Sequence, residues 1–319
     1  MGQIAVLVPT MRRPESLARA LRSLFAQDAP QLIAQIVVVD NSPEASARAT
    51  VDALRSASPV ALTYVHEPRP GVATARNAGL AAADAPLIAF LDDDEEAPPQ
   101  WLARLAAAHA SYGAAVTFGP VQGVTPPGTG WAAPYLDRFF SRLGPETSGP
   151  IEEAYGCGNS IMTRALALPG PAPFDTGSDE TGGEDDKLFA ALRARGGGFA
   201  WAADAPVLEH APADRAKLSY ALWRAFGYGQ TPSELCARDG DWPGVAKWMA
   251  VGVAQVLVFS LKAAMLWAAN NPARAEAADR AARGLGKVFW WSPQRFYGQA
   301  AAKRSSASAG VAAAPAPIG

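Results

Sequence analysis

Short apolar runs alternate with helix-like segments over the first ninety residues, and this alternation constrains the fold more than any other feature. The apolar runs are rich in β-branched residues and lie at 4–8, 36–39, 61–65 and 87–91. Such runs are typical of strands buried on both faces of a parallel sheet. Helical periodicity falls between and after them, at 14–25, 45–54 and 76–83. This order predicts a doubly wound α/β domain, whose ligands bind beyond the carboxyl ends of the strands.

The rhythm changes after residue 97. A helix is expected at 101–110 and a strand at 115–118, and the glycine- and proline-rich stretch at 123–134 is expected to be a loop. A further helix is predicted at 184–195, ended by three glycines at 196–198.

Composition excludes some classes of protein. A formal net charge of -2 over 319 residues and a pI near 6.0 argue against a general nucleic-acid binder. Two cysteines, Cys157 and Cys236, are too few for a disulfide framework and fit a reducing cytoplasm. The first apolar segment lacks a basic run before it and ends at Pro9, so we expect no signal peptide.

Three consecutive aspartates, Asp92 to Asp94, directly follow the apolar run at 87–91. If the strand geometry continues, Asp92 and Asp94 point to one side and can converge on a cation. Mg²⁺ usually takes one or two carboxylates together with substrate phosphates. The cluster therefore indicates a metal site completed by the substrate, and the alternative is a solvated acidic turn that caps a helix.

Two further features fall at the same predicted edge of the sheet. Asp40 ends the second strand, where its carboxylate could bind a nucleoside or cap the following helix. A glycine-containing turn into the helix at 76–83 offers backbone N–H groups and a cation to an anion. Its residues of interest are Pro70, Gly71, Arg76, Asn77 and Gly79.

A second acidic cluster opens the helix at 184–195. Glu184, Asp185 and Asp186 follow two glycines, and their carboxylates either stabilise the helix dipole or supply a general base. His210, one of three histidines, ends a predicted strand of sequence VLEH. A single histidine there is either a ligand or an ordinary surface or core residue.

Taken together, these motifs resemble the inverting glycosyltransferase family two, whose fold is called GT-A. The matching segments are VLVPT, VVVDNS, PGVATARNAG, FLDDDE, GCGNSIMTR, GGEDDKLFAALRARG and VLEH. They follow the family order, and the acidic motif combined with the GED motif is far more specific than either alone. A further run, HAPADRAKLSYALWRAFGYG, is similar to bacterial members of the succinoglycan type, which extend exopolysaccharides or other lipid-linked glycans.

The resemblance implies a donor site for a nucleotide sugar. Asp40 would contact the base, while Arg76 and Asn77 would face the nucleotide or its diphosphate. The full set of implied donor-binding residues is Pro9, Asp40, Arg76, Asn77, Asp92 and Asp93.

The same resemblance implies the metal ligands and the catalytic carboxylates. Mg²⁺ or Mn²⁺ would be bound by Asp92, Asp94 and His210, with Asp94 the better aspartate ligand. Asp185 matches the general base of the family, and Glu184 would hold the acceptor or support the pocket. The family often has a second Asp followed by Leu where this chain has DDK, which leaves the choice between Asp185 and Asp186 open.

The C-terminal third contains a long apolar helix candidate. Residues 248–261 carry no charge, and Lys247, Gln255 and Lys262 fall on one narrow helical stripe. Such a helix could be buried, lie in a membrane interface, or span the bilayer. Residues 262–304 carry a net charge of +6, and they include the aromatic residues Phe289, Trp290, Trp291, Phe296 and Tyr297. This composition favours a membrane surface, with a solvated basic helix pair as the alternative.

We therefore expect an α/β protein of the GT-A type, with a Rossmann-like, doubly wound, mostly parallel sheet, an acceptor subdomain and a C-terminal helical extension. The expected segments are a nucleotide-sugar-binding half at 1–96, an acceptor-binding and catalytic half at 97–240, a membrane-associating helical extension at 241–302 and a disordered tail at 303–319.

The expected activity is metal-dependent, inverting transfer of a sugar from a nucleotide sugar, with a UDP-sugar favoured, to a glycan acceptor. The acceptor is expected to be lipid-linked and to serve surface or exopolysaccharide synthesis at the inner face of the cell membrane, where a cytoplasmic enzyme would bind peripherally. One alternative is a nucleotidyl- or phosphotransferase, which would leave the GED motif without a role. Another is a catalytically silent nucleotide-sugar-binding membrane scaffold, which the two intact carboxylate sets disfavour.

Overall fold

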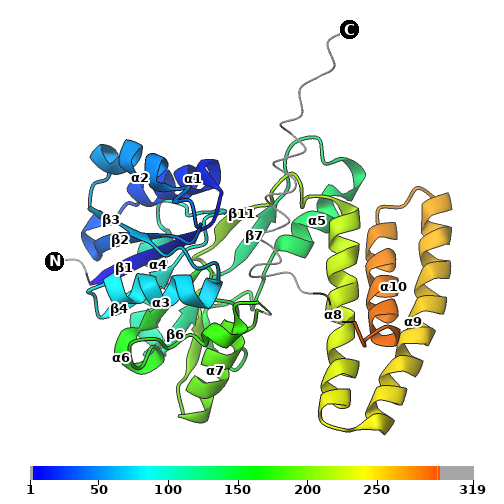
Figure 1. The fold of residues 1–319 in the computed structure, drawn as a ribbon. Coiled ribbons are helices and arrows are strands. Elements are labelled where there is room, and N and C mark those ends of the chain that lie inside the picture. The colour runs from blue at the N-terminus through cyan, green and yellow to red at the C-terminus, as the bar shows by residue number, and fades with distance from the viewer. Residues whose placement is uncertain (1–2, 181, 293, 295–319) are drawn as a thin grey trace. The chain divides into compact units, whose positions relative to one another are not determined.

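The computed structural model divides into two compact units, and it describes residues 3–180, 182–292 and 294 (Figure 1). Among the described residues, the first unit comprises the chain up to Gln122 and Arg142–Glu209, and the second comprises Gly123–Ser141 and residues 210–294. This division differs from the segments expected at 1–96, 97–240 and 241–302, because the helical unit already begins at His210. The tail at 303–319 and the aromatic residues Phe296 and Tyr297 lie outside the described residues.

The first unit is built on a sheet of eight strands in the order β3-β2-β1-β4-β9-β6-β10-β8. The strands are β1 Ile4–Thr10, β2 Ile33–Asp40, β3 Ala61–His66, β4 Leu87–Phe90, β6 Val116–Phe118, β8 Gly149–Ile151, β9 Ser160–Thr163 and β10 Phe199–Trp201. Strands β3, β2, β1 and β4 are parallel to one another, and β9 runs antiparallel between β4 and β6. The expected α/β fold with a mostly parallel sheet is confirmed.

Helices cover both faces of this sheet (Figure 1). One face packs against α1 Pro14–Phe25, α2 Arg48–Leu54 and α4 Trp101–Tyr112, and the other against α3 Val72–Ala82, α6 Arg164–Ala167 and α7 Glu184–Ala194. The described residues also form short 3₁₀ segments, namely η1 Pro30–Leu32, η2 Arg55–Ala57 and η4 Thr176–Ser178 in the first unit and η3 Gly130–Ala132 in the second.

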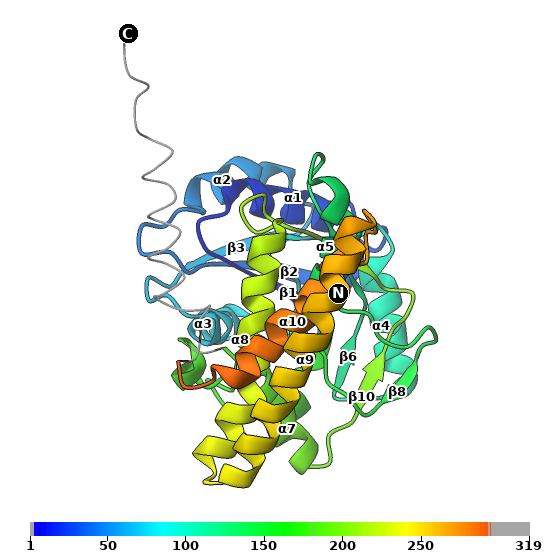
Figure 2. The same cartoon turned by 90° about the vertical axis from the view of Figure 1, so that its right-hand side faces the viewer.

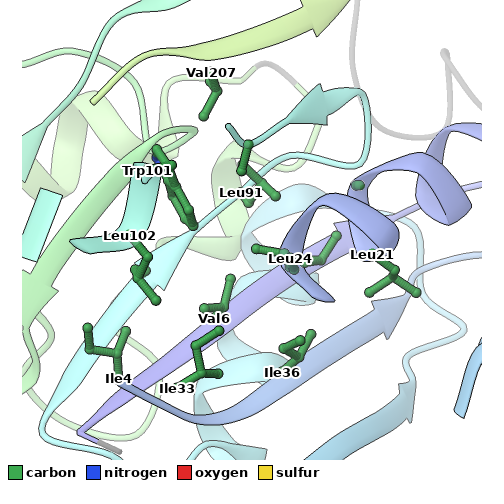
Figure 3. Packing of buried hydrophobic residues seen from close by; sticks show 14 of the residues in the cluster. Ile4, Val6, Leu21, Leu24, Ile33, Ile36, Leu91, Trp101, Leu102 and Val207 are labelled. Carbon is green, nitrogen blue, oxygen red and sulfur yellow. The ribbon is translucent and has the colours of Figure 1, made fainter. Parts of the chain in front are cut away.

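The central strands are buried on both faces, as their unbroken apolar runs predict. In β1, Ile4 and Val6 belong to the core under α1 and α4, while Leu7 belongs to the core under α3 and α7. Figure 3 shows the first of these cores, where Leu21 and Leu24 of α1 lie over β1 and β2.

The second unit contains three long helices that lie side by side (Figure 2). They are α8 Leu218–Arg238, α9 Trp242–Ala268 and α10 Arg274–Val288, and the short helix α5 Ala133–Phe140 belongs to the same unit. Helices α9 and α10 approach so closely that a Cβ on Gly284 would lie 2.8 Å from the carbonyl oxygen of Gly252. A smaller sheet, of order β5-β11-β7, has most of its residues in the first unit and is formed by β5 Glu95–Glu96, β7 Val121–Val124 and β11 Val207–His210.

Three local expectations need correction. Helix α3 begins at Val72, four residues before the expected start, and α2 begins at Arg48 because Ala45 has a left-handed φ of 57° that a helix excludes. The stretch expected to be a loop at 123–134 contains the end of β7, the segment η3 and the start of α5.

The polar stripe expected on α9 is divided. Lys247 and Lys262 are exposed, whereas Gln255 is half-buried and packs against Gly284 of α10. One possibility was that this apolar helix is buried. Within the second unit that prediction is wrong, because only 6% of the most apolar 18-residue stretch of α9 is buried.

Candidate active site

Both acidic motifs of the sequence belong to the first unit, and they meet at the carboxyl end of β4. Asp92 to Asp94 follow this strand, and Glu184 and Asp185 open α7. Because β1, β2 and β4 run parallel, their carboxyl ends also bring Thr10 and Asp40 to the same edge of the sheet.

Asp93 and Asp94 share one guanidinium. The Nη1 atom of Arg13 lies 2.9 Å from Asp93 Oδ1 and 2.7 Å from Asp94 Oδ2. The hydroxyl of Thr10 also donates to Asp93 Oδ2 at 2.7 Å, and the Asp93 side chain is buried. These carboxylates raise the pKa of Arg13, mainly through the charge on Asp93. Asp93 is therefore held by the protein itself, whereas the Asp94 side chain remains half-buried at the edge of the cluster.

Asp92 lies in a narrow space beside a glycine. A Cβ on Gly158 would lie 2.5 Å from Asp92 Oδ2 and 2.8 Å from Glu95 Oε1, so this position leaves room only for glycine. Arg142 donates to Glu95 Oε1 at 3.1 Å, and the backbone N–H of Asp92 donates to Glu95 Oε2 at 2.9 Å. Burial raises the pKa of Asp92 and raises that of Glu95 well above its usual value, while Arg142 opposes both shifts.

Glu209 is a member of this cluster that motif reasoning missed. It lies in β11 directly opposite Glu95 of β5 in the antiparallel register. Burial and the nearby charge of Asp94 raise the pKa of Glu209 to about 8. In the sequence, Glu209 was marked only by its position in the VLEH motif, in which sequence reasoning selected the neighbouring His210. His210 itself begins the second unit, so its role as a metal ligand stays a prediction.

Arg76 connects the two acidic motifs. Its Nη1 donates to Glu184 Oε1, and the side chains of Arg76 and Glu184 are only 7% and 6% exposed. The Nε atom of Arg76 is buried without a hydrogen-bond partner among the described residues. Burial raises the pKa of Glu184, and Arg76 opposes that shift. Asp92 and Asp185 also act on Arg76 through their charges, so one guanidinium faces carboxylates of both motifs.

Asp185 and Asp186 differ in their surroundings. Asp185 is half-buried, and its Oδ2 accepts a hydrogen bond from the backbone N–H of Cys157 at 3.3 Å. Asp186 is exposed, and its pKa is raised by partial burial and by the charge of Asp185. The charge of Asp185 raises the pKa of both Asp92 and Arg76.

Several residues expected at the donor site are held by the protein. Asp40 is fully buried and accepts four hydrogen bonds, from the Ser42 hydroxyl and N–H, from the Ala47 N–H and from the Tyr64 hydroxyl. This arrangement favours the structural alternative for Asp40, because the Ala47 N–H leads into α2. Asn77 is bonded through both side-chain atoms to the backbone of Phe174. Pro9 is half-buried and pairs with Val39 in the sheet. The donor contacts of all three residues stay predictions.

The turn that was expected to offer N–H groups to an anion binds a carboxylate of the protein itself. Asp179 Oδ1 accepts from the N–H groups of Ala73 at 2.8 Å and Thr74 at 3.3 Å, in the first turn of α3. Sequence reasoning missed Asp179, because it lies 106 residues from Ala73.

Comparison with known proteins decides the family of this site. Residues 5–167 match the family model described as "Glycosyl transferase family 2". Over 238 residues the chain is 37% identical to the succinoglycan biosynthesis protein ExoM of Rhizobium meliloti. This alignment covers 73% of this chain and 75% of ExoM. The chain belongs to glycosyl transferase family 2.

Solved structures agree with the fold of this glycosyltransferase. The mannosyltransferase PcManGT from Pyrobaculum calidifontis, in complex with GDP-Man and Mn²⁺, aligns over 90% of this chain and 87% of its own, with a TM-score of 0.57 and 19% identity. Residues 1–349 of S. aureus TarS in complex with UDP-GlcNAc align over 90% of both chains, with a TM-score of 0.54 and 16% identity. The glycosyltransferase therefore has the GT-A fold.

The charges of the glycosyltransferase site leave an excess of carboxylates. The guanidiniums in it are those of Arg13, Arg76 and Arg142, and the carboxylates are those of Asp92, Asp93, Asp94, Glu95, Glu184, Asp185 and Glu209. Among the described residues, no group of three His, Cys, Asp or Glu side chains is arranged to hold a metal by itself. Two carboxylates, Asp92 and Asp94, fit a Mg²⁺ or Mn²⁺ ion that takes its remaining ligands from water and phosphate.

Proposed function

We propose that this glycosyltransferase moves a sugar, with inversion, from a nucleotide-sugar donor to a glycan acceptor in surface or exopolysaccharide synthesis. The observation that carries the proposal is the meeting of both acidic motifs around Arg76. A nucleotidyl- or phosphotransferase would use the first motif and leave Asp185 without a task. The name of ExoM and the nucleotide sugars bound in PcManGT and TarS support a nucleotide-sugar donor and a polysaccharide product.

The proposed reaction needs a base on one side of the anomeric carbon. As the acceptor hydroxyl oxygen bonds to the anomeric carbon, Asp185 takes its proton and the nucleoside diphosphate leaves from the opposite face. Asp92 and Asp94 would hold a divalent ion, which supplies Lewis-acid stabilisation of the diphosphate leaving group. Glu184 lies against Arg76 and is placed to support Asp185 rather than to take the proton.

The test compares two adjacent aspartates. Asp185→Asn is expected to lower kcat by the ~10²- to 10⁴-fold contribution of a general base while leaving the Kd for the nucleoside diphosphate unchanged. Asp186→Asn is the matched control, because its side chain is exposed. Slow hydrolysis of UDP-glucose, UDP-galactose, UDP-GlcNAc and GDP-mannose with Mn²⁺ provides the assay. A larger loss in Asp186→Asn, with both variants folded, would contradict the assignment.

The metal is tested by binding rather than by turnover. Asp94→Asn removes one negative charge from the proposed site, so calorimetry with UDP should show weaker binding in the presence of Mn²⁺ and little change without it. UDP binding that is equally tight with and without Mn²⁺ in the unaltered protein would exclude the metal site.

We further propose that α9 binds the inner face of the cell membrane and presents the enzyme to lipid-linked acceptors. One face of this helix exposes Val253, Leu257, Val258, Leu261 and Met265, each 48–68% exposed. We call this set the α9 apolar face. Trp242 and Trp267, at the two ends of the helix, are 63% and 51% exposed, and tryptophan favours the membrane–water interface.

Binding along the surface is favoured over spanning, although α9 is long and apolar enough to cross a membrane. Helix α10 packs along α9, with Arg280 lying over the ring of Phe259 and Gly284 against Gly252. A spanning α9 would draw the charges of α10 into the bilayer, at ~2.5 to 3.5 kcal/mol for each Asp, Lys or Arg at its centre. An interfacial helix avoids this cost, because α10 stays on the aqueous side.

Flotation of the full-length protein with anionic liposomes tests the proposal. Replacing Leu257 and Leu261 together by glutamate should abolish flotation, because both leucines are more than 60% exposed on the α9 apolar face. The matched control replaces Leu143 and Leu166, which are 61% and 56% exposed in the first unit. Equal flotation of both double variants would refute membrane binding through α9.

A further inference from the structure

The described residues 174–180 and 182–184 precede the proposed base, and three of them are attached to helix α3. Asn77 of α3 exchanges two hydrogen bonds with the backbone of Phe174. Asp179 binds the first turn of α3, and Arg76 of α3 binds Glu184. Asp185 follows directly after the last of these attachments.

The middle attachment is a charged cap supplied from a distant part of the chain. Besides the two N–H groups, the Thr74 hydroxyl donates to Asp179 Oδ2 at 2.6 Å. A carboxylate at a helix N-terminus is favoured both by these donors and by the helix dipole. Gly71, the N-cap of α3, makes the approach possible, because a Cβ at this position would overlap the Asp179 carboxylate.

The chain between this cap and α7 is poorly fixed by its own sequence. Gly182 and Gly183 have φ values of 77° and 82°, in a region that glycine enters at little cost. The conformational preferences of glycine do not by themselves select these φ values. The N–H of Gly182 donates to the carbonyl oxygen of Ser178 at 2.7 Å, so the start of α7 is tied to the residue next to Asp179. Of the attachments to α3, Arg76 already serves the charge balance of the site, whereas Asp179 contacts none of the proposed substrate-binding groups.

We propose that Asp179 is a positioning residue, which sets the place of Asp185 through the hydrogen bond between Ser178 and Gly182 at the start of α7. The inference rests on the proposed function of Asp185 as the base. A base displaced by about 1 Å can cost 10²-fold in rate, so the effect of a lost cap should appear in kcat. Donor binding should change little, because Arg76 and Asn77, the implied donor-binding residues of α3, keep their own bonds to Glu184 and to the backbone of Phe174.

The experiment uses three substitutions, each of which disrupts the contact between the Asp179 carboxylate and the first turn of α3. Asp179→Ala removes the acceptor, Thr74→Val removes the hydroxyl donor, and Gly71→Ala pushes the carboxylate away. Thr74→Ser retains the hydroxyl and should keep near-normal kcat. The matched control is Gln35→Ala, which removes the hydrogen bond from Gln35 Nε2 to the Ala82 carbonyl at the opposite end of the same helix.

We expect Asp179→Ala and Gly71→Ala to lower kcat for donor hydrolysis by ~10- to 100-fold with an unchanged KM for the donor. Gln35→Ala should lower Tm to a similar degree but leave kcat within about 2-fold, since only the helix is weakened and the segment at 179–184 keeps its cap. In hydrogen exchange, the amides of residues 182–188 should exchange faster in Asp179→Ala and as in the unaltered protein in Gln35→Ala.

Two outcomes overturn the inference: kcat in Asp179→Ala that equals that of Gln35→Ala, or a loss that appears only as a raised KM. If the unaltered protein hydrolyses none of the four nucleotide sugars, the proposed function fails. Hydrogen exchange then decides the inference by itself, because unchanged exchange at 182–188 in Asp179→Ala shows that the cap positions nothing.

Discussion

The buried pair of Arg76 and Glu184 gives a prediction that the structure allows to be worked through. Arg76→Met removes the guanidinium and leaves Glu184 facing an apolar side chain, with only 6% of Glu184 exposed. Removing one partner of a buried ion pair costs about 3–5 kcal/mol, because the other charge remains without compensation. We expect about 3 kcal/mol at pH 8, the lower end, since Glu184 can escape part of the cost by taking up a proton.

Because Glu184 can take up a proton, the stability that Arg76→Met loses depends on pH. Burial already raises the pKa of Glu184 in the unaltered protein, and losing Arg76 removes a group that holds this pKa down. The folded variant therefore binds a proton that the unfolded chain releases at lower pH, so its stability falls as the pH rises through the raised pKa. Arg76→Met should be close to the unaltered protein at pH 5 and much less stable at pH 8.

Differential scanning calorimetry at pH 5 and pH 8 measures this. At about 2–4 °C per kcal/mol for a domain of this size, the expected loss at pH 8 lowers Tm by roughly 6–12 °C. Glu184→Gln should cost less, about 1.5 kcal/mol, because Asp92 and Asp185 still face Arg76. A Tm for Arg76→Met that falls equally at both pH values, or a larger loss in Glu184→Gln, would refute this account of the pair.

Three further predictions concern other sites. In the folded protein the pKa of Glu209 is raised to about 8, so its contribution to stability is present below the pKa of the unfolded chain and is lost as the pH rises through about 8. Between pH 6 and pH 9, Glu209→Gln should reduce this loss of stability by up to about 2 kcal/mol, as measured by urea unfolding. An equal loss in the variant and the unaltered protein would contradict the prediction. Gly158→Ala should cost about 1–3 kcal/mol and most of the activity, because its Cβ would lie 2.5 Å from Asp92 Oδ2, whereas Gly198→Ala, which meets nothing within 4 Å, should be neutral in the same melting experiment. Gly284→Ala should separate α9 from α10 at a similar cost, and urea unfolding with no loss would show that the helices tolerate a wider spacing.

The excess of carboxylates explains why the stability of the protein should depend on pH and on substitutions in the acidic cluster. Burying a carboxylate without a matching cation costs free energy, and burial raises the pKa of Asp92, Glu95 and Glu209 together. Three guanidiniums face these carboxyl groups, and Glu209, with its pKa raised to about 8, is largely protonated at neutral pH. Burial of the cluster therefore costs stability at any pH where these groups are ionised. A bound divalent ion would lower this cost, which links the proposed metal to stability as well as to turnover.

The parts of this fold that sequence reasoning predicted are those that depend on neighbouring residues. Strands β1, β2 and β4 have unbroken apolar runs, and α1 repeats Leu17, Leu21 and Leu24 at helical spacing, so each element is specified within a dozen residues. The start of α3 was predicted four residues late because its cap, Asp179, comes from 106 residues away. Arg13 and Arg142 were missed as partners of the acidic motif for the same reason, since only the folded chain brings them to it.

Asp40 and Asp92 show why the site itself could be predicted only in part. Both aspartates follow an apolar run at the carboxyl end of a parallel strand, and sequence reasoning placed both in the donor site. Asp40 is surrounded by four protein donors, which satisfy its charge. Asp92 instead lies among carboxylates, and burial together with the charges of Asp94 and Asp185 raises its pKa against two guanidiniums. The sequence does not say how far the charge of a strand-end aspartate is matched, because that property depends on Ser42, Ala47 and Tyr64 around Asp40 and on the space that Gly158 leaves beside Asp92. The donor contacts of both aspartates therefore stay predictions.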